Sequence, residues 1–506
     1  MTSRPWTAAP TSVFVTATVV TVALPWVAFT NMVLFHFYVR GAFVLDSGLL
    51  GFLTWRSNAA LTQPDSLGGG SFFAIHVAPL FLVTSQISWL LPISLPQFFA
   101  GFVGLSHVLL ALAVFWLLAE GYGLRQSGSV WLAALAGVAF AFSGLAVAIA
   151  RYPHFETYIA AFFLLFATAR ALGYERVGVI FLFLGLSTRE DAGLHYAAVL
   201  IVTAAFDRWR GQRVRQNDWW FTLIAMAYSA AIILGQRLIF PGGSAFARVY
   251  LGMPPLGHID ITLISNRLLY LLVNRPYILL PALAAVIWAI RVRNPAVLVG
   301  YVAALPWLLL HVLAKSPLAG ALSSYYAFPF LIALGWPLIA VLRQRQAEGS
   351  IGSATGPLIG FALLLALTFV PAGDVHNPGR LPLPEAFLAA PTRAQQAATD
   401  RAVATLSAAR PSLGRLFVDN SVAAIDPAGF TRDEIPNWSG LVPPVSETPD
   451  TVVLMKDGYD ADRLRAIAAA AGLSHHYNIM GTQLRVVARR RLDDTTALIR
   501  VLGSED

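Results

Sequence analysis

Ionisable residues that could do chemistry stand at the ends of long apolar segments in this chain of 506 residues. Asp46 follows the first such segment, His154 and Glu156 lie two residues apart between two later ones, and residues 189–191 read Arg-Glu-Asp. His154 and Glu156 are close enough for both to reach one cation or one substrate hydroxyl from a loop. A carboxylate or an imidazole can accept a proton from a hydroxyl, and a guanidinium pairs with a phosphate. These residue types therefore suit acid–base chemistry beside a phosphate.

Each group also has a purely structural explanation, which the sequence leaves open. Asp46 is suited to cap a helix by accepting hydrogen bonds from its first N–H groups. Glu156, and likewise Glu190 and Asp191, suit the start of a helix, where the helix dipole favours negative charge. Arg189 would then only neutralise its two neighbours.

The composition decides what kind of protein must position these groups. Hydrophobic side chains make up 57% of the chain and charged ones only 12%, against roughly 45–50% and 25% in soluble domains. A soluble domain cannot bury that much apolar surface, because single cores stop growing near ~250–300 residues. This excludes a soluble globular enzyme and a disordered protein, and without cysteines there is no disulfide framework or thiolate nucleophile. We expect a helical membrane protein with many spans.

Apolar stretches long enough, or nearly so, to cross a membrane predict eleven helices. Residues 72–94 are also apolar but contain His76 and two prolines, so an interfacial or re-entrant segment is expected there. The eleven predicted spans are 12–36, 97–119, 128–150, 157–173, 176–187, 192–206, 219–237, 276–291, 295–314, 323–342 and 354–372.

The distribution of charge divides the chain in two. Residues 1–372 carry 21 Lys and Arg against 11 Asp and Glu, whereas residues 373–506 carry 14 against 16. The first part is predicted to be a transmembrane domain and the second a soluble α/β domain. In that second domain we expect helices at 391–409 and 460–471. Strands are expected at 415–418, 451–455 and within 475–490.

An odd number of spans puts the two termini on opposite sides, and arginines in short loops favour the cytoplasmic side. This rule predicts a cytoplasmic N-terminus and a C-terminal domain outside the cytoplasm, which is the periplasm if the membrane is the inner membrane of a Gram-negative bacterium. The basic residues then serve orientation, and binding to nucleic acid is not indicated. Five acids fall on the cytoplasmic side, where we expect them to be solvated: Glu120, Glu175, Asp207, Asp218 and Glu348.

The remaining candidate residues gather on the outer side in this topology. An ionisable group near membrane depth is costly unless it is paired or faces a cavity, which makes these positions functional candidates. A basic outer segment that carries Arg237, Arg248, Arg267 and Arg275 is suited to a phosphate head group, or to anionic lipid in general. Tyr325 and Tyr326 open a span and could equally form part of an aromatic belt.

Five short motifs occur in order across residues 40–330 and carry a resemblance. The chain resembles a family of polytopic membrane proteins of unassigned function that is distantly similar to the GT-C membrane glycosyltransferases. The motifs are Leu45-Asp-Ser-Gly48, Phe73-Ala-Ile-His-Val-Ala-Pro79, His154-Phe-Glu156, Arg189-Glu-Asp191 and Tyr325-Tyr-Ala-Phe-Pro329.

The resemblance implies a fold, a reaction and a set of roles. The fold would be GT-C-like, and the enzyme would move a sugar from a polyprenyl-phosphate donor to a lipid, glycan or protein acceptor of the cell envelope, at the outer face of the membrane. It implies that Asp46 is the base and that His154 and Glu156 are the second catalytic motif. Donor phosphate would bind to Arg189, Arg248 and Arg275, and substrate would be positioned by His76, Glu190, Asp191, Tyr325 and Tyr326.

The resemblance suggests a divalent metal ion, Mg or Mn, as a possible cofactor. Asp46, His154 and Glu156 would hold it. The family commonly has two acids in the second motif, and His154 replaces the first of them, whereas hard cations prefer oxygen ligands. No other cofactor is expected.

Two other functions remain open. A flippase or transporter of lipid-linked sugars would use similar ligands, but transporters place their ionisable residues near the membrane midplane. A noncatalytic scaffold would not need so many ionisable residues at one mouth. We therefore favour the enzyme and expect Asp46, His154, Glu156 and Arg189 to converge on one outer cavity.

Overall fold

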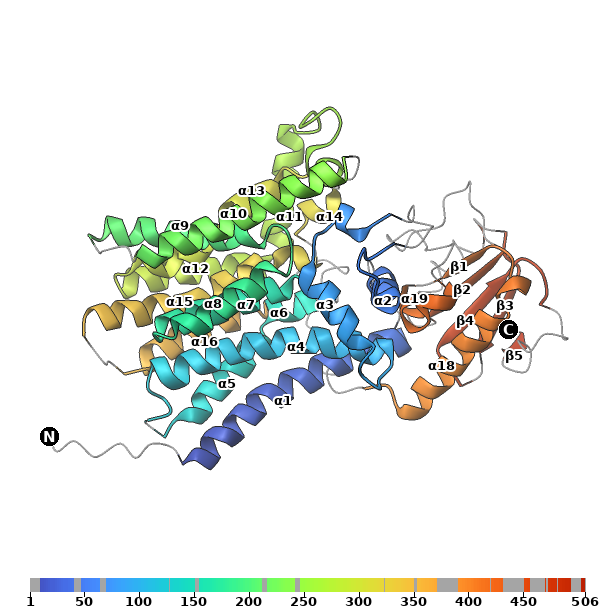
Figure 1. The fold of residues 1–506 in the computed structure, drawn as a ribbon, viewed down its shortest axis with the longest axis horizontal. Coiled ribbons are helices and arrows are strands. Elements are labelled where there is room, and N and C mark those ends of the chain that lie inside the picture. Colours follow the sequence, from blue (N-terminus) through green and yellow to red (C-terminus); the bar gives the residue numbers. More distant parts are fainter. Residues whose placement is uncertain are drawn as a thin grey trace.

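The computed structural model describes residues 10–40, 47–63, 70–126, 128–150, 154–211, 216–241, 246–322, 324–349, 353–370, 390–418, 420–430, 450–455, 469, 472–479, 481–492 and 502–505. Helices lie side by side and make up most of this part, and a small sheet lies at one end of the molecule (Figure 1). The first helix begins at the opposite end (Figure 1). Asp46, the side chain of Arg248 and most of the helix predicted at 460–471 lie outside the described residues.

Each of the eleven apolar segments coincides with a helix or a bent helix pair. Leu95–Trp116 starts with a capping box at Ser94, and Pro276 and Pro329 open their helices, where a missing N–H costs nothing. The helices are α1 (Thr11–Phe35), α4 (Leu95–Trp116), α5 (Val130–Ala141), α6 (Gly144–Ala150), α7 (Thr157–Ala171), α8 (Glu175–Leu186), α9 (Ala192–Trp209), α10 (Gln216–Ile239), α12 (Pro276–Arg291), α13 (Val299–Val312), α15 (Pro329–Ala347) and α16 (Thr355–Leu367).

Shorter elements connect these helices. The apolar residues 72–94 do not form one helix but a 3₁₀ turn, η3 (Phe72–Ala74), and the short α3 (Pro79–Ser88). Among the described residues, five helices are long and apolar enough to cross a membrane, and seven if each bent pair counts as one span. The bent pairs are α5 with α6, at 47°, and α11 (Ile261–Asn274) with α12, at 81°. The remaining short elements are α2 (Ser47–Arg56), α14 (Pro317–Gly320), and the π-helical turns η1 (His36–Arg40), η4 (Leu117–Gly121) and η5 (Ala247–Leu251).

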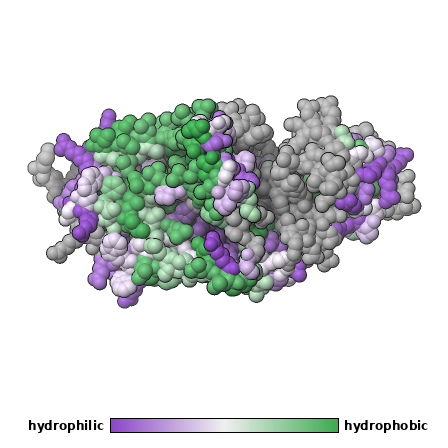
Figure 2. All heavy atoms as spheres, turned by 90° about the horizontal axis from the view of Figure 1, so that it is seen from above, coloured by the Kyte–Doolittle hydropathy of each residue, from purple (hydrophilic) through white to green (hydrophobic). Residues whose placement is uncertain are grey.

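The helical part exposes apolar side chains on its outside as well as burying them inside. Figure 2 shows hydrophobic residues spread over its visible face, with hydrophilic residues more frequent near the ends. Helix α10 alone exposes Trp219, Trp220, Leu223, Leu234 and Leu238. Soluble monomers rarely expose continuous apolar patches larger than a few hundred Å². The helical part is therefore that of a membrane protein.

Close packing of α8, α9 and α10 fixes the turn that carries Arg189. A Cβ atom on Gly193 would lie 2.0 Å from the carbonyl oxygen of Ala225, so α9 and α10 can approach closely only with glycine there. A Cβ atom on Gly185 would lie 1.8 Å from the Tyr196 hydroxyl, which donates to the Ile159 carbonyl at 2.8 Å. These contacts hold the start of α9 against α7 and α8.

Two of the acids expected to be solvated are buried, which corrects that expectation. Arg343 Nη2 donates to Asp207 at 2.7 Å, and Arg170 Nη1 lies 2.5 Å from Asp218. Both carboxylates are less than a tenth exposed. A buried carboxylate needs a cationic partner, and arginines from neighbouring helix ends supply one here.

The C-terminal region forms a five-stranded sheet with a separate hydrophobic core. Its strand order is β1-β2-β4-β3-β5, and β1 runs parallel to β2 while the other neighbours are antiparallel. The predicted strands are confirmed, and the predicted helix is α18 (Arg393–Ala408), capped by Thr392. The elements are β1 (Leu416–Val418), α19 (Asn420–Ile425), α20 (Pro427–Phe430), β2 (Thr451–Met455), β3 (His475–Ile479), β4 (Leu484–Ala488) and β5 (Leu502–Glu505).

This region rests on the helical part through α19 and α18. A Cβ on Gly51 of α2 would lie 3.3 Å from the Cα of Ala424 in α19, which shows how closely the two helices pack. The Tyr38 hydroxyl donates to Asp400 of α18 at 2.9 Å.

Candidate active site

Arg189 lies at the centre of a buried charge cluster in the turn between α8 and α9. Its Nη1 donates to Glu156 Oε1 at 2.6 Å, and its Nε and Nη2 donate to the two oxygens of Asp191 at 2.6 and 2.5 Å. The arginine and Glu156 are almost wholly buried. Bidentate pairing of this kind is strong and fixes the orientation of the guanidinium.

His154 and Glu156 belong to the same cluster and contact Arg189 directly or through one another, but neither lines the cavity that Arg189 reaches, so the predicted convergence on one cavity is not met for these two residues. The Nδ1 of His154 faces the second oxygen of Glu156 and must donate to it, because an ionised carboxylate only accepts. The His154 ring stacks on Tyr325 with 4.3 Å between ring centroids. Glu156 directly precedes α7, as the helix-start explanation expects, but its side chain makes no capping bond to that helix and pairs with Arg189 and His154 instead.

His195, which the sequence analysis did not single out, completes the cluster. It lies one helical turn after Asp191, and its Nε2 is 3.6 Å from the Asp191 carboxylate. Its ring lies edge-on against Trp307 and Phe328. The spacing of four residues after an acid at a helix start was the available signal.

The cluster shifts the pKa values of its members. Burial by itself raises the pKa of Asp191, but the charges of Arg189 and His195 outweigh it and hold this pKa well below its usual range. Burial lowers the pKa of His154, and the charges of His76 and Arg189 lower it further. Asp191 is therefore ionised over the whole physiological range of pH.

Glu190 makes a second, separate set of contacts. Its Oε1 accepts from His76 Nδ1 and its Oε2 from the Val77 backbone N–H, both at 2.9 Å. The Leu80 N–H donates to the Ser187 carbonyl at 2.7 Å. Gln236 of α10 donates to the Phe73 carbonyl at 2.7 Å. The segment from η3 to α3 is thereby held against the 187–190 turn and the end of α10.

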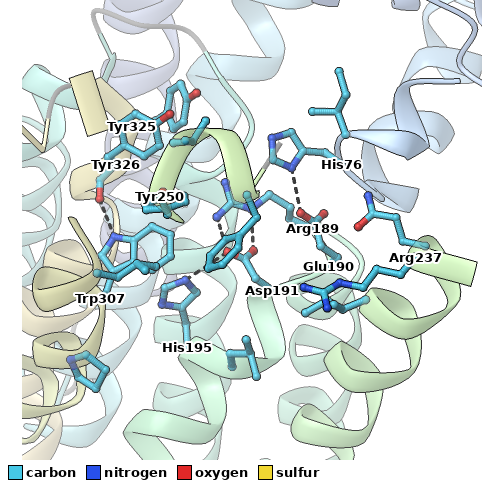
Figure 3. Close-up of a pocket in the computed structure, with 18 of the residues that line it drawn as sticks. His76, Arg189, Glu190, Asp191, His195, Arg237, Tyr250, Trp307, Tyr325 and Tyr326 are labelled. Carbon is cyan, nitrogen blue, oxygen red and sulfur yellow. Dashed lines mark hydrogen bonds and ion pairs between the residues drawn. The ribbon is translucent and has the colours of Figure 1, made fainter. Parts of the chain in front are cut away.

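A cavity of about 670 Å³ opens beside these two groups. Figure 3 shows His76, Arg189, Glu190, Asp191, His195 and Arg237 around it, with Trp307, Tyr250, Tyr325 and Tyr326 on another side. Volumes of 300–1,000 Å³ are usual for binding pockets of small molecules. Its apolar walls come from three helices, α9, α10 and α13, through Leu194, Ala198, Ile233, Ala303, Pro306 and Leu310.

Arg237 belongs to the basic outer segment that the sequence analysis matched to a phosphate head group, although it was not one of the three predicted phosphate ligands. It lines the cavity from the end of α10 and is exposed. Within the described ranges, it makes no ion pair, in contrast to Arg189. The sequence could not rank Arg237 above the other arginines of that segment, so the cavity itself was needed to identify it.

Arg275, another predicted phosphate ligand, does not line this cavity. Arg275 is almost fully buried and donates to the carbonyls of Ala321 and Asn274, both at 2.8 Å. It does not line the cavity, which corrects its predicted place: its charge neutralises the carbonyl end of α11 at the sharp bend into α12. Arg248 lies in η5, and its side chain is outside the described residues.

His154 and Glu156 do not fit a divalent cation as they stand. One oxygen of Glu156 is bonded to Arg189 and the other to His154. Within the described ranges, no group of three or more His, Asp or Glu residues is arranged to hold a metal ion. A cation bound to Glu156 would have to displace Arg189 or His154 from its oxygens.

Comparisons with known proteins gave few matches. No family model matches the chain, and neither does any curated protein. Two solved structures are similar, both crystal structures of ArnT from Cupriavidus metallidurans. The one bound to undecaprenyl phosphate is 14% identical, with a TM-score of 0.46, over 95% of this chain and 99% of that chain. The one in the apo state is 12% identical, with a TM-score of 0.45, over 95% and 97%.

Both likenesses are distant, so the resemblance to the GT-C glycosyltransferases stays a prediction. A likeness this distant assigns no activity, which has to come from the cavity itself.

Proposed function

We propose that this protein is a membrane glycosyltransferase that takes a sugar from a polyprenyl-phosphate donor and passes it to an acceptor hydroxyl. The observation that carries the proposal is the make-up of the cavity, which joins arginines and acids at one end to apolar walls from three helices. A polyprenyl phosphate that carries a sugar likewise combines charged, polar and apolar parts, namely its phosphate, its sugar ring and its lipid tail. The ArnT structure with undecaprenyl phosphate shows that a protein of similar overall arrangement binds such a lipid.

Arg237 is the main phosphate ligand in this proposal, with Arg189 as its second. Glu156 and Asp191 together carry more negative charge than Arg189 can neutralise, so this group by itself does not attract an anion. Arg189 has five N–H donors, of which three are engaged by the two carboxylates. Arg237, without such partners among the described residues, offers its full charge and fork-shaped donor set to a phosphate.

The lipid tail would lie along α10. Ile233, Gln236 and Arg237 of this helix line the cavity, whereas Leu234, Leu238 and Ile239 are exposed on its outer surface. A tail leaving the cavity beside Arg237 would thus pass directly into lipid. This arrangement keeps the phosphate near the head-group level, where anionic groups are hydrated and least costly.

The sugar would lie against the aromatic side of the cavity. Trp307, Tyr250, Tyr325 and Tyr326 line it there. The Trp307 indole N–H donates to the Tyr326 carbonyl at 2.9 Å, which fixes the orientation of the ring. Aromatic rings offer large apolar faces with few rotatable bonds, and the neighbouring Asp191 and Glu190 carboxylates can accept from sugar hydroxyls.

We also propose that the cavity opens on the periplasmic side of a bacterial inner membrane. Residues 1–372 would form the membrane domain, and residues 373–506 the periplasmic domain. The support comes from contacts at the opposite end, where Arg125 lies over Phe14 near the start of α1, and where Arg343 and Asp207 pair. Those arginines mark the cytoplasmic side by the rule that governs short loops.

Binding of undecaprenyl phosphate tests the proposal. We expect Arg237→Ala to weaken binding about tenfold, because a hydrogen bond to a charged group contributes roughly 1.5–3 kcal/mol and 1.4 kcal/mol is one factor of ten. Native mass spectrometry of the purified protein with undecaprenyl phosphate, and with undecaprenol for comparison, measures this directly. Treatment with EDTA should change neither value.

The matched control is Arg401→Ala, since Arg401 is exposed on α18. The proposal is contradicted if the wild-type protein binds undecaprenol as tightly as undecaprenyl phosphate, or if Arg237→Ala and Arg401→Ala behave alike.

A further inference from the structure

His76 and Glu190 form a pair of the kind that activates a base. Both line the cavity, and their side chains are 29% and 12% exposed. Figure 3 shows the His76 ring at the cavity, joined to Glu190 below it by the 2.9 Å contact of its Nδ1. The second oxygen of Glu190 is held by the Val77 N–H, so the carboxylate cannot turn away from the ring.

The contact with Glu190 determines which nitrogen of His76 carries the proton. An ionised carboxylate has no hydrogen to donate, so Nδ1 must be the donor. In the neutral ring this leaves the lone pair on Nε2. Within the described part of the chain, no group makes a hydrogen bond to that nitrogen. His76 therefore has an available proton acceptor at the cavity.

The other acids and imidazoles of the site are less suited to accept a proton. Glu156 is fully buried and both its oxygens are bonded. Asp191 is held by two bonds from Arg189, which lowers its affinity for a proton. His195 directs Nε2 to Asp191, and its ring is enclosed by Trp307 and Phe328.

We propose that His76 is the catalytic base of the transfer and that Glu190 is its positioning residue, an inference that rests on the proposed function. The acceptor hydroxyl gives its proton to His76 Nε2 while its oxygen forms a bond to C1 of the sugar. The bond between C1 and the phosphate oxygen breaks, and polyprenyl phosphate leaves with the bonding electrons. Glu190 holds the ring and stabilises the imidazolium that forms. This assigns to His76 the role that the family resemblance implied for Asp46.

The same contacts also hold the η3–α3 segment in place, so a test has to separate chemistry from support. His76→Asn retains an N–H donor toward Glu190 but has no basic nitrogen. Glu190→Gln retains the size and the acceptor for Val77, but its amide donates to Nδ1. The proton of the His76 ring is then forced onto Nε2, and the base is lost although the ring stays.

Nitrogen NMR of protein labelled with ¹⁵N-histidine reports this proton directly. The His76 signals are identified by their loss in His76→Asn. We expect the wild-type ring to be protonated on Nδ1 and the ring in Glu190→Gln to be protonated on Nε2. A neutral wild-type ring protonated on Nε2 would overturn the inference, because no lone pair would then be available at the cavity.

Transfer is measured with radiolabelled undecaprenyl-phosphate glucose, mannose, galactose and arabinose as donors and bacterial membrane lipid as the acceptor. We expect His76→Asn and Glu190→Gln each to slow transfer ~10²-fold or more, the range for a positioned base. Binding of undecaprenyl phosphate should stay within twofold of the wild type, and the control His476→Asn, on β3, should transfer normally.

The outcomes separate the inference from the function on which it rests. If the wild type transfers a sugar and His76→Asn does so at an equal rate, the inference falls and the proposed function stands. If the wild type binds undecaprenyl phosphate but transfers from none of these donors, the proposed function falls and the inference falls with it. A flippase of lipid-linked sugars would then be the better explanation of the cavity.

Discussion

Arg189 and Arg237 line one cavity, but their surroundings give them different tasks. Arg189 is enclosed by Glu156 and Asp191, and breaking a buried ion pair leaves an uncompensated charge that costs about 3–5 kcal/mol. Its first role is therefore to hold α7 and α9 together at the site. Arg237 is exposed and makes no ion pair with any described residue, so its charge is available to a ligand.

Sequence reasoning brought His154, Glu156 and Arg189 together for a sound physical reason. Charged groups near membrane depth must be paired, so residues on one side of the membrane that could pair were expected to meet. The sequence left open that Arg189 neutralises Glu190 and Asp191, but not that it pairs with Glu156 in place of Glu190, because pairing geometry depends on how the helices pack. His195 was missed for a similar reason, and Arg237 could not be told apart from the other arginines of the basic outer segment until the cavity was seen.

Asp191 gives a prediction about pH. Its pKa in the folded protein is lower than in the unfolded chain, where it titrates near ~3.9, so it stabilises the fold above that pH and loses this effect as the pH falls further. We expect Asp191→Asn to lower the midpoint of thermal unfolding by a constant amount between pH 8 and 5.5, and by less toward pH 3. Differential scanning fluorimetry in detergent measures both proteins.

Asp260→Asn is the control for this experiment, because Asp260 caps α11 and asparagine caps a helix equally well. A difference between wild type and Asp191→Asn that grows as the pH falls below 5 would contradict the sign of the pKa shift.

At the level of elements, the length of each apolar segment was enough to place the helices. A segment that crosses lipid must form hydrogen bonds between its own backbone N–H and C=O groups, and a helix does so. The bends within the helices depend on contacts with other parts of the chain and could not be predicted from the sequence. The chain turns between α5 and α6 at Gly144, whose N–H donates to Thr368 of the segment after α16 at 2.8 Å. A Cβ there would lie 1.9 Å from the Thr368 carbonyl oxygen, so the bend follows from a close contact with a distant part of the chain.

Gly193 gives a prediction about helix packing. Gly193→Ala should move α9 away from α10, because the added methyl would overlap the Ala225 carbonyl, and the cavity between these helices should lose its shape. We expect a lower unfolding temperature and weaker binding of undecaprenyl phosphate, each measured as above.

The matched variant is Gly235→Ala in α10, where no atom would lie within 4 Å of the new Cβ. This change should be neutral or slightly stabilising, since alanine favours a helix by roughly 1 kcal/mol over glycine. Equal effects of the two substitutions would show that the α9–α10 contact does not shape the cavity.

Across the whole molecule, paired charges gather at two opposite ends of the helical part. Arg343 pairs with Asp207 in the last turn of α9, whereas Arg189 and Asp191 directly precede the first turn of that helix, so the two groups lie at its opposite ends. The division of the chain by charge was visible in the sequence. The docking of the C-terminal region was not, because it depends on contacts such as that between Tyr38 and Asp400, which are 362 residues apart.

Membrane orientation gives a prediction at this scale. Alkaline phosphatase, which is active only outside the cytoplasm, should be active when fused after residue 506 and inactive when fused after Arg215, in the connection between α9 and α10. Green fluorescent protein at the same two positions should show the opposite pattern. Fluorescence from a fusion at residue 506 would overturn both the orientation and the proposed reaction.

The central claim is that the cavity between α9, α10 and α13 holds a polyprenyl phosphate. Photocrosslinking tests this most directly, with an undecaprenyl phosphate analogue that carries a diazirine close to the phosphate, followed by peptide mass spectrometry. We predict crosslinks to cavity residues such as Ile233, Tyr250 and Trp307, which weaken about tenfold in Arg237→Ala. Crosslinks confined to exposed residues such as Trp219 and Leu135, unchanged by Arg237→Ala, would contradict the account.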